Sequence, residues 1–97
     1  MKLKYTEEHR KLFQAVLSLE TEEECAAFFE DICTIKEIQD LTQRLCVAER
    51  LDSGEKYNNI EAATGASTAT ISRVNKCLNY GSGGYQTVLK RMNKENS

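Results

Sequence analysis

The sequence contains no proline, and its 5 glycines all lie after residue 53. Proline and glycine are the two residues that most disfavour the interior of a helix. Because neither interrupts the first half of the chain, the sequence favours helices throughout. It also shows no internal repeat, no low-complexity linker and no strand of convincing length. We therefore predict an all-α fold.

Long apolar runs are also missing. No stretch approaches the roughly 18 consecutive apolar residues that mark a membrane-spanning helix. The first residues, MKLKYTEEHRKLF, are charged throughout and lack the apolar core of a signal peptide. We therefore expect no membrane partner and a cytoplasmic location. A length of 97 residues predicts a single domain, 1–97.

Metal-binding and catalytic patterns are absent as well. The four cysteines, Cys25, Cys33, Cys46 and Cys77, form no CxxC pair, and His9 is the only histidine. Without paired ligands no zinc site is expected, so we interpret the cysteines as reduced, mostly buried apolar side chains. No nucleophile pairs with a base and no acidic dyad is visible. We predict no catalytic residue, no metal and no enzyme activity.

Charge is distributed unevenly along the chain. The formal net charge is −2. Residues 1–35 contain 4 basic and 8 acidic side chains, whereas residues 62–97 contain 5 basic side chains and Glu95 as the only acid. The C-terminal third therefore has a balance of +4. Such a local excess suits contact with a polyanion even when the whole chain is slightly acidic.

Six helices are predicted from capping signals and from apolar residues that recur every three or four positions. Thr6, Thr21 and Thr34 are suitable N-caps, and Glu24 and Glu37 complete capping-box patterns with the last two. Asn58 and Glu61 resemble a further cap pair. Glycine at positions 54 and 81 marks the ends of the third and fifth helices. The predicted helices span residues 6–19, 21–32, 34–53, 58–64, 67 or 68–80, and 85–92.

The segment 57–78, YNNIEAATGASTATISRVNKCL, has the pattern of a helix-turn-helix. Gly65 stands where the first helix must reverse, and glycine can take the left-handed conformation that such a turn needs. Ile60 and Ala63 are predicted to pack beneath the turn, and Ala66 is predicted to point inward. The second helix is predicted to bury Ile71, Val74 and Leu78, which share one face.

The opposite face of that second helix is small, polar or basic. It carries Ala69, Ser72, Arg73 and Lys76, with Thr68 and Thr70 on its flanks, and no acidic residue occurs from position 62 to position 94. Hydroxyl groups and arginine can bond to bases or phosphates, and a small alanine allows close approach to a thymine methyl. The pattern favours a helix that enters the major groove of DNA. A helical protein-interaction adaptor is the alternative.

At this segment the sequence resembles the Trp repressor superfamily, and more closely its branch of small proteins called YerC/YecD. The strings that carry the resemblance are TGASTATISRVN at 64–75 and CLNYGSGGY at 77–85. The Trp repressor pattern G-A-x-x-A-T-I-T-R matches residues 65–73, with Ser72 in place of the second threonine. The likeness to the small-protein branch covers nearly the whole chain.

The resemblance implies a six-helix, intertwined dimer of the Trp repressor type. Residues 1–53 would supply the dimerisation helices, 57–80 the helix-turn-helix and 85–94 the C-terminal helix. The residues expected to meet DNA are Gly65, Ala66, Thr68, Ala69, Thr70, Ser72, Arg73 and Lys76.

The tryptophan pocket of the repressor is only partly matched. Thr34, Arg44 and Arg73 are of the residue types that line it, but Val74 replaces the glycine on which the indole ring lies. Cys77 also replaces a serine that helps to bind the ligand. We therefore expect neither tryptophan nor another cofactor. The resulting prediction is a sequence-specific DNA-binding transcriptional regulator, a repressor, that acts as a homodimer on an inverted repeat in double-stranded DNA.

Overall fold

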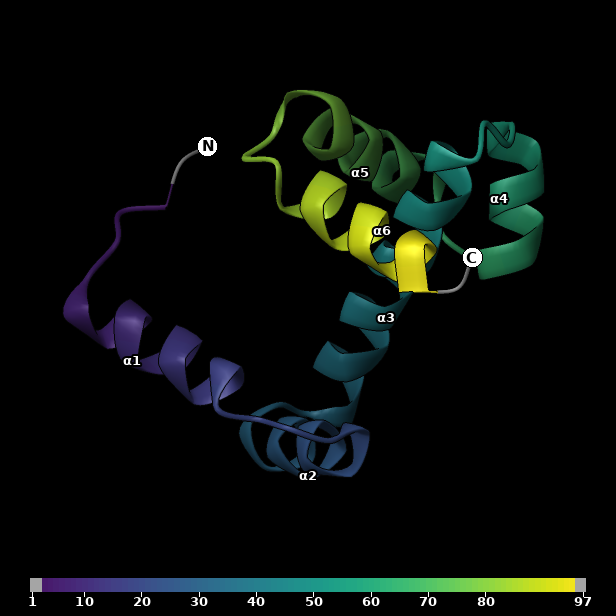
Figure 1. Cartoon of the computed structure of the whole chain (residues 1–97). Helices are drawn as coiled ribbons and strands as arrows, with labels where there is room; N and C mark the ends of the chain where they lie inside the picture. Colours follow the sequence, from purple (N-terminus) through teal and green to yellow (C-terminus); the bar gives the residue numbers. More distant parts are fainter. Residues whose placement is uncertain (1–2, 96–97) are drawn as a thin grey trace. The chain divides into compact units, whose positions relative to one another are not determined.

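The computed structural model describes residues 3–95 and is all-α over that range (Figure 1). The order and number of the helices are as the sequence predicts. The element bounds differ from the predicted ones by at most three residues. The helices are α1 (Glu7–Leu17), α2 (Glu22–Ile32), α3 (Ile35–Asp52), α4 (Tyr57–Thr64), α5 (Thr68–Tyr80) and α6 (Gly84–Glu95). No helix in residues 3–95 is long and apolar enough to cross a membrane.

The chain divides into two compact units, Met1–Gln39 and Asp40–Ser97. The first contains α1, α2 and the start of α3, and threonine caps begin all three helices. The Thr34 hydroxyl accepts from the Glu37 N–H at 3.1 Å, and the Glu37 carboxylate accepts from the Thr34 N–H at 2.8 Å, which is the predicted capping box. Caps of this kind satisfy N–H groups that have no partner inside the helix.

The other two caps of this unit differ in detail from the prediction. The Thr21 hydroxyl accepts from the Glu24 N–H at 3.1 Å, but the Glu24 carboxylate accepts from the N–H of Glu20 and not from that of Thr21. In α1 the third residue of the capping box is His9, whose Nδ1 accepts from the Thr6 N–H at 3.1 Å. The sequence pattern did not predict that His9 completes a capping box, because the usual residue at that position is Glu or Gln.

The apolar faces of α1 and α2 contain no buried residue. Phe13 contacts Tyr5 with ring centroids 5.5 Å apart, and Phe28 contacts Phe29 at 5.8 Å. Even so, large apolar side chains of this region remain open to solvent. Leu17 is 82% exposed and Ile35 is 75% exposed. The periodicity thus predicted the helices correctly, but it did not predict burial within one chain.

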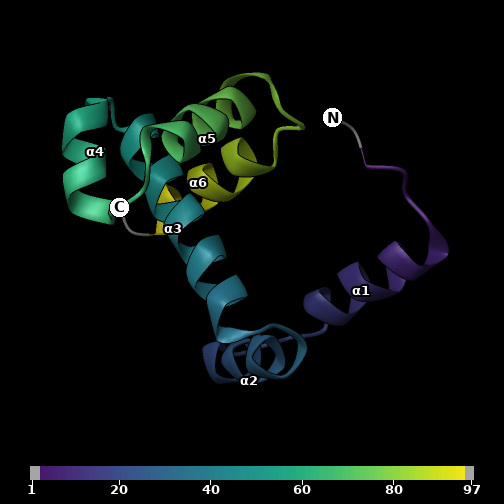
Figure 2. The ribbon, with the colours of Figure 1, turned by 180° about the vertical axis from the view of Figure 1, so that it is seen from behind.

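The core lies in the second unit, which contains the rest of α3 with α4, α5 and α6. Figures 1 and 2 show α5 and α6 side by side, and α5 also contacts α4. The Gln86 amide, on α6, donates to the Leu78 carbonyl of α5 at 2.9 Å. The buried cluster consists of Val47, Ala48, Ile60, Ala66, Ile71, Val74, Leu78 and Leu89.

Three expectations from the sequence are wrong. Ala63, predicted to pack beneath the turn, is exposed. The helix α4 begins at Tyr57 after Lys56, with no side-chain cap, so Asn58 is not its N-cap. The cysteines are not mostly buried, because Cys25, Cys33 and Cys46 are partly exposed and Cys77 is exposed. The errors at Ala63 and at the cysteines concern the burial of a side chain, which depends on the neighbouring helices.

Candidate nucleic-acid interface and adjoining pocket

The turn between α4 and α5 is held by local hydrogen bonds around one left-handed glycine. Gly65 has φ +73° and its N–H donates to the Glu61 carbonyl at 2.9 Å, which ends α4. The Thr64 hydroxyl donates to the Ile60 carbonyl at 2.7 Å and accepts from the Ala66 N–H at 3.2 Å. From α3, the Gln43 amide donates to the Thr64 carbonyl at 3.1 Å. The turn is therefore tied both to itself and to the neighbouring helix.

The helix α5 begins directly after this turn. The Ser67 hydroxyl caps it by accepting from the Thr70 N–H at 3.2 Å. The N–H groups of Thr68 and Ala69 lie in the first turn and have no acceptor within the helix. They point outward from the end that carries the positive pole of the helix dipole, where a phosphate is favoured.

The two faces of α5 separate as the sequence predicts. Ile71, Val74 and Leu78 are buried, at 0%, 3% and 6% exposed. They fix the rotation of the helix about its axis. The opposite face is left open to solvent, and its exposed residues are Thr68, Ala69, Ser72, Arg73 and Lys76, while Thr70 is partly buried on the flank.

Two of the predicted DNA-contacting residues hold the turn in this structure. Ala66 is buried, and its N–H donates to Thr64. The N–H of Gly65 is bonded to the Glu61 carbonyl. Both amides thus have intramolecular acceptors, whereas the N–H groups of Thr68 and Ala69 at the start of α5 have none within the helix. A phosphate contact by Gly65 or Ala66 stays a prediction.

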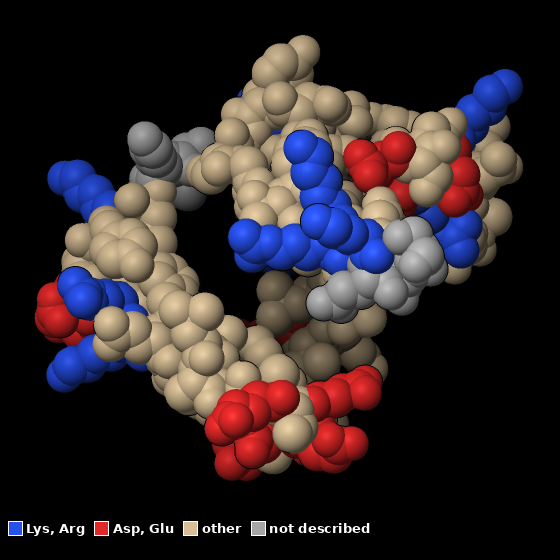
Figure 3. Space-filling model, in the orientation of Figure 1, with Lys and Arg blue, Asp and Glu red and all other residues tan. Residues whose placement is uncertain are grey.

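Charge is segregated between elements. Figure 3 shows acidic side chains gathered over α2 and basic side chains gathered over α6. The acids of α2 are Glu22, Glu23, Glu24, Glu30 and Asp31, and the basic residues of α6 are Lys90, Arg91 and Lys94.

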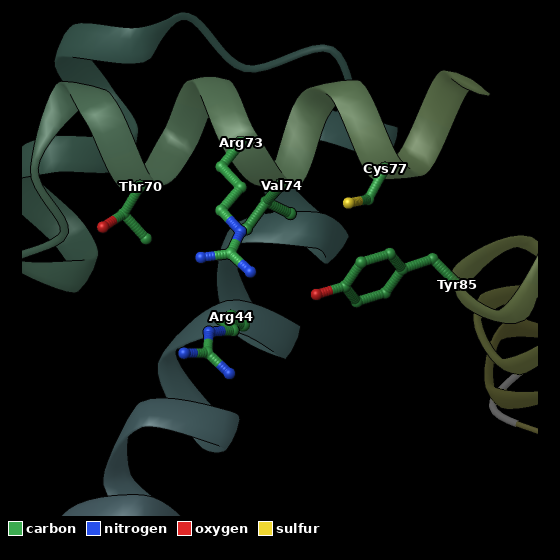
Figure 4. A pocket seen from close by; sticks show the side chains of 6 residues that line it. All are labelled: Arg44, Thr70, Arg73, Val74, Cys77 and Tyr85. Carbon is green, nitrogen blue, oxygen red and sulfur yellow. The ribbon is translucent and has the colours of Figure 1, made fainter. Parts of the chain in front are cut away.

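A pocket of about 260 Å³ lies between α3, α5 and α6. Arg44 reaches it from α3 and Tyr85 from α6, while α5 supplies Thr70, Arg73, Val74 and Cys77. Figure 4 shows both guanidinium groups and the Tyr85 hydroxyl directed toward the same space. None of the described lining residues is acidic.

The pKa of Tyr85 reflects the electrostatics of the pocket. Burial raises the pKa of the Tyr85 hydroxyl above its ordinary value of 10.0, and the Cys77 thiol raises it further. The guanidinium groups of Arg44 and Arg73 act in the opposite direction. Tyr85 therefore keeps its proton at neutral pH and can donate a hydrogen bond into the pocket.

Of the three residues predicted for a ligand pocket, the structure brings Arg44 and Arg73 together. Thr34 belongs to the first unit, where its hydroxyl caps α3. Val74 lines the pocket wall, as its position in the pattern suggests. Tyr85 was missed as a lining residue, and no local pattern marks it, because it reaches the pocket only through the packing of α6 on α5.

A tight glycine turn, a helix whose inward face packs on the core, and an outward face of small, polar and basic residues define a helix-turn-helix protein. The chain belongs to the Trp repressor protein family, whose family model matches residues 7–93. This is a family of DNA-binding regulatory proteins. The expected all-α, Trp-repressor-like fold is confirmed.

Individual relatives agree with this assignment. The uncharacterized protein YerC of Bacillus subtilis (strain 168) is 57% identical over 82 residues, which cover 84% of this chain and 79% of YerC. A TrpR-like protein of Eubacterium eligens has 52% identity and a TM-score of 0.88, with 91% of each chain covered. A candidate Trp repressor of Staphylococcus aureus has 49% identity and a TM-score of 0.88, covering 92% of this chain and 89% of its own.

Proposed function

We propose that the protein is a sequence-specific transcriptional regulator that binds an inverted repeat in double-stranded DNA as a homodimer and represses transcription. The observation that carries the proposal is the orientation of α5. Three buried residues, Ile71, Val74 and Leu78, turn a small and polar face outward. A helix of this kind, presented after a tight turn, fits the major groove.

The predicted contacts divide into two kinds. Thr68, Ala69, Thr70 and Ser72 lie where side chains can meet base edges and account for specificity. Lys76, an exposed residue, is placed to contact phosphate and contributes to affinity. Arg73 is exposed and also lines the pocket, so it can contact either DNA or a molecule in the pocket. The proposal that the protein represses transcription, and does not activate it, is taken from the family. The cytoplasmic location stays a prediction.

Selection of bound duplexes from a random pool tests this function directly. We expect enrichment of an inverted repeat whose half-sites are about one helical turn apart. The affinity for the selected duplex should fall steeply with salt, because bound Lys and Arg release counterions from the phosphates. If no duplex is enriched, or if affinity does not depend on salt, the proposal is wrong and the protein-interaction adaptor becomes the better account.

The homodimer is supported by apolar surface that the chain itself does not cover. Leu17, Ile35 and Leu41 are 82%, 75% and 47% exposed. Clusters of large apolar side chains in solvent are unusual in a monomer and mark surfaces that associate. We propose that a second copy covers the helices of residues 1–53.

Ile35→Glu is therefore expected to convert the dimer to a monomer. Ile35 is the first residue of α3, where a glutamate suits the helix dipole, so the helix itself should persist. Burial of the new charge at an interface would be costly. Sedimentation analysis should show a dimer for the natural protein and a monomer for the variant. Ser82→Glu, which adds the same charge at an exposed position outside residues 1–53, is the matched control, and equal masses for all three proteins would contradict the dimer.

L-tryptophan is expected to leave the affinity for DNA unchanged. Val74 stands at the wall of the pocket where, by resemblance, the repressor has a glycine beneath the indole ring. A β-branched side chain there takes up space that the ring would need. Calorimetry should give no binding heat, and the DNA titration curve should not shift on adding tryptophan. Micromolar binding of tryptophan would show that the pocket accepts the ring despite Val74.

A further inference from the structure

The start of α5 is bonded to an acidic residue of α4. The Thr68 hydroxyl donates to Oε1 of Glu61 at 3.0 Å. Both side chains are exposed, and Thr68 is the first residue of α5. The bond therefore holds a carboxylate beside the end of the helix proposed to enter the groove.

An acid at this place is unexpected on a surface proposed to meet DNA. Glu61 is the last acidic residue before the acid-free segment 62–94. A carboxylate close to phosphates is repelled by them and gains nothing from the sugar-phosphate backbone, which offers no hydrogen-bond donor. The donors that the major groove does offer are the amino groups of cytosine and adenine.

These two donors have different neighbours. Adenine presents an acceptor, N7, next to its amino group, whereas the major-groove edge of cytosine carries the amino donor alone. A carboxylate is an acceptor only, so N7 of adenine would repel it. Because Thr68 engages Oε1, the second carboxylate oxygen can accept from an external donor. The local chemistry therefore favours cytosine.

We propose that Glu61 is a specificity-determining residue that accepts a hydrogen bond from the amino group of one cytosine in each half-site, and that Thr68 positions its carboxylate. This inference rests on the proposed DNA-binding function. It extends the reading surface from α5 alone to the last turn of α4.

The test compares duplex selections from one random pool for the natural protein and three variants. The natural protein should prefer cytosine at one position of each half-site by about 5- to 100-fold over the other bases. Glu61→Gln should shift that position toward adenine, since a glutamine amide can pair with the N6 and N7 groups. Glu61→Asp keeps the charge but shortens the side chain, so the preference for cytosine should fall without a gain in non-specific affinity.

Glu49→Gln is the matched control, because it removes the same charge from an exposed position on α3. It should select the same duplexes as the natural protein. Circular dichroism tests whether each variant folds. If Glu61→Gln does not fold, Glu61→Asp alone tests whether Glu61 determines the preference for cytosine. Identical selected bases for the natural protein and the folded Glu61 variants, even with uniformly tighter binding, would overturn this inference while leaving the proposed function intact. A natural protein that enriches no duplex would overturn both.

Discussion

Replacing Ile71 by alanine is expected to lower the free energy of unfolding by about 2–5 kcal/mol. Ile71 is 0% exposed and belongs to a buried cluster to which α3 contributes Val47 and α4 contributes Ile60. Removing its outer carbons leaves a cavity among helices that cannot fully close around it. Domains of this size are stable by only about 5–15 kcal/mol, so this is a large fraction of the total. Urea denaturation followed by circular dichroism measures the loss.

A graded substitution provides the control for this prediction. Ile71→Val removes one methyl group and should cost about 0.5–1.5 kcal/mol, between the natural protein and the alanine variant. Near the unfolding midpoint, DNA affinity should fall in the same order, from the natural protein through Ile71→Val to Ile71→Ala. The reason is that α5 loses its packing on the core when the protein unfolds. An Ile71→Ala protein as stable as the natural one would show that α5 does not pack as the structure has it.

Replacing Ala69 by glutamate is expected to reduce DNA affinity at least about 100-fold, because like charges brought into contact cost several kcal/mol. Ala69 is exposed on the outward face of α5, next to the open N–H groups of the first turn. A glutamate there fills the space through which the helix approaches the bases and places a negative charge against the phosphates. Fluorescence anisotropy with the selected duplex provides the measurement.

Folding should not change in this variant, since exposed substitutions usually alter stability by less than about 0.5 kcal/mol. Ser53→Glu is the matched control, because it adds the same charge to an exposed position of the same unit outside the α4–α5 turn. We expect it to retain nearly full affinity. If Ala69→Glu binds as tightly as Ser53→Glu, the outward face of α5 is not the DNA-reading surface.

Local signals predicted most of the fold. These signals begin or end a helix and involve only residues that are close in the sequence. They are the Thr34 and Glu37 capping pair, Ser67 before α5, and the glycines at positions 54, 65 and 81. Their hydrogen bonds and backbone angles depend little on the rest of the chain, so the sequence predicts them well. The inward face of α5 was also predictable, because a buried stripe on a helix follows from its period of 3.6 residues.

Environments set by more than one helix were not predictable in this way. Val47 on α3 is fully buried, whereas Leu41 on the same helix is 47% exposed and Val88 on α6 is 45% exposed. Which of several apolar residues becomes buried depends on the crossing of neighbouring helices. A single helical period contains no information about that crossing.

The sequence by itself determined the six helices, the glycine turn and the composition of the outward face of α5, since each depends on short-range backbone chemistry and on residue type. Only the tertiary structure decided that Tyr85 joins Arg44 and Arg73 in a pocket and that Glu61 is bonded to Thr68. These residues come from different helices. Their distances are set by packing of the buried cluster, which brings together side chains that the sequence keeps apart.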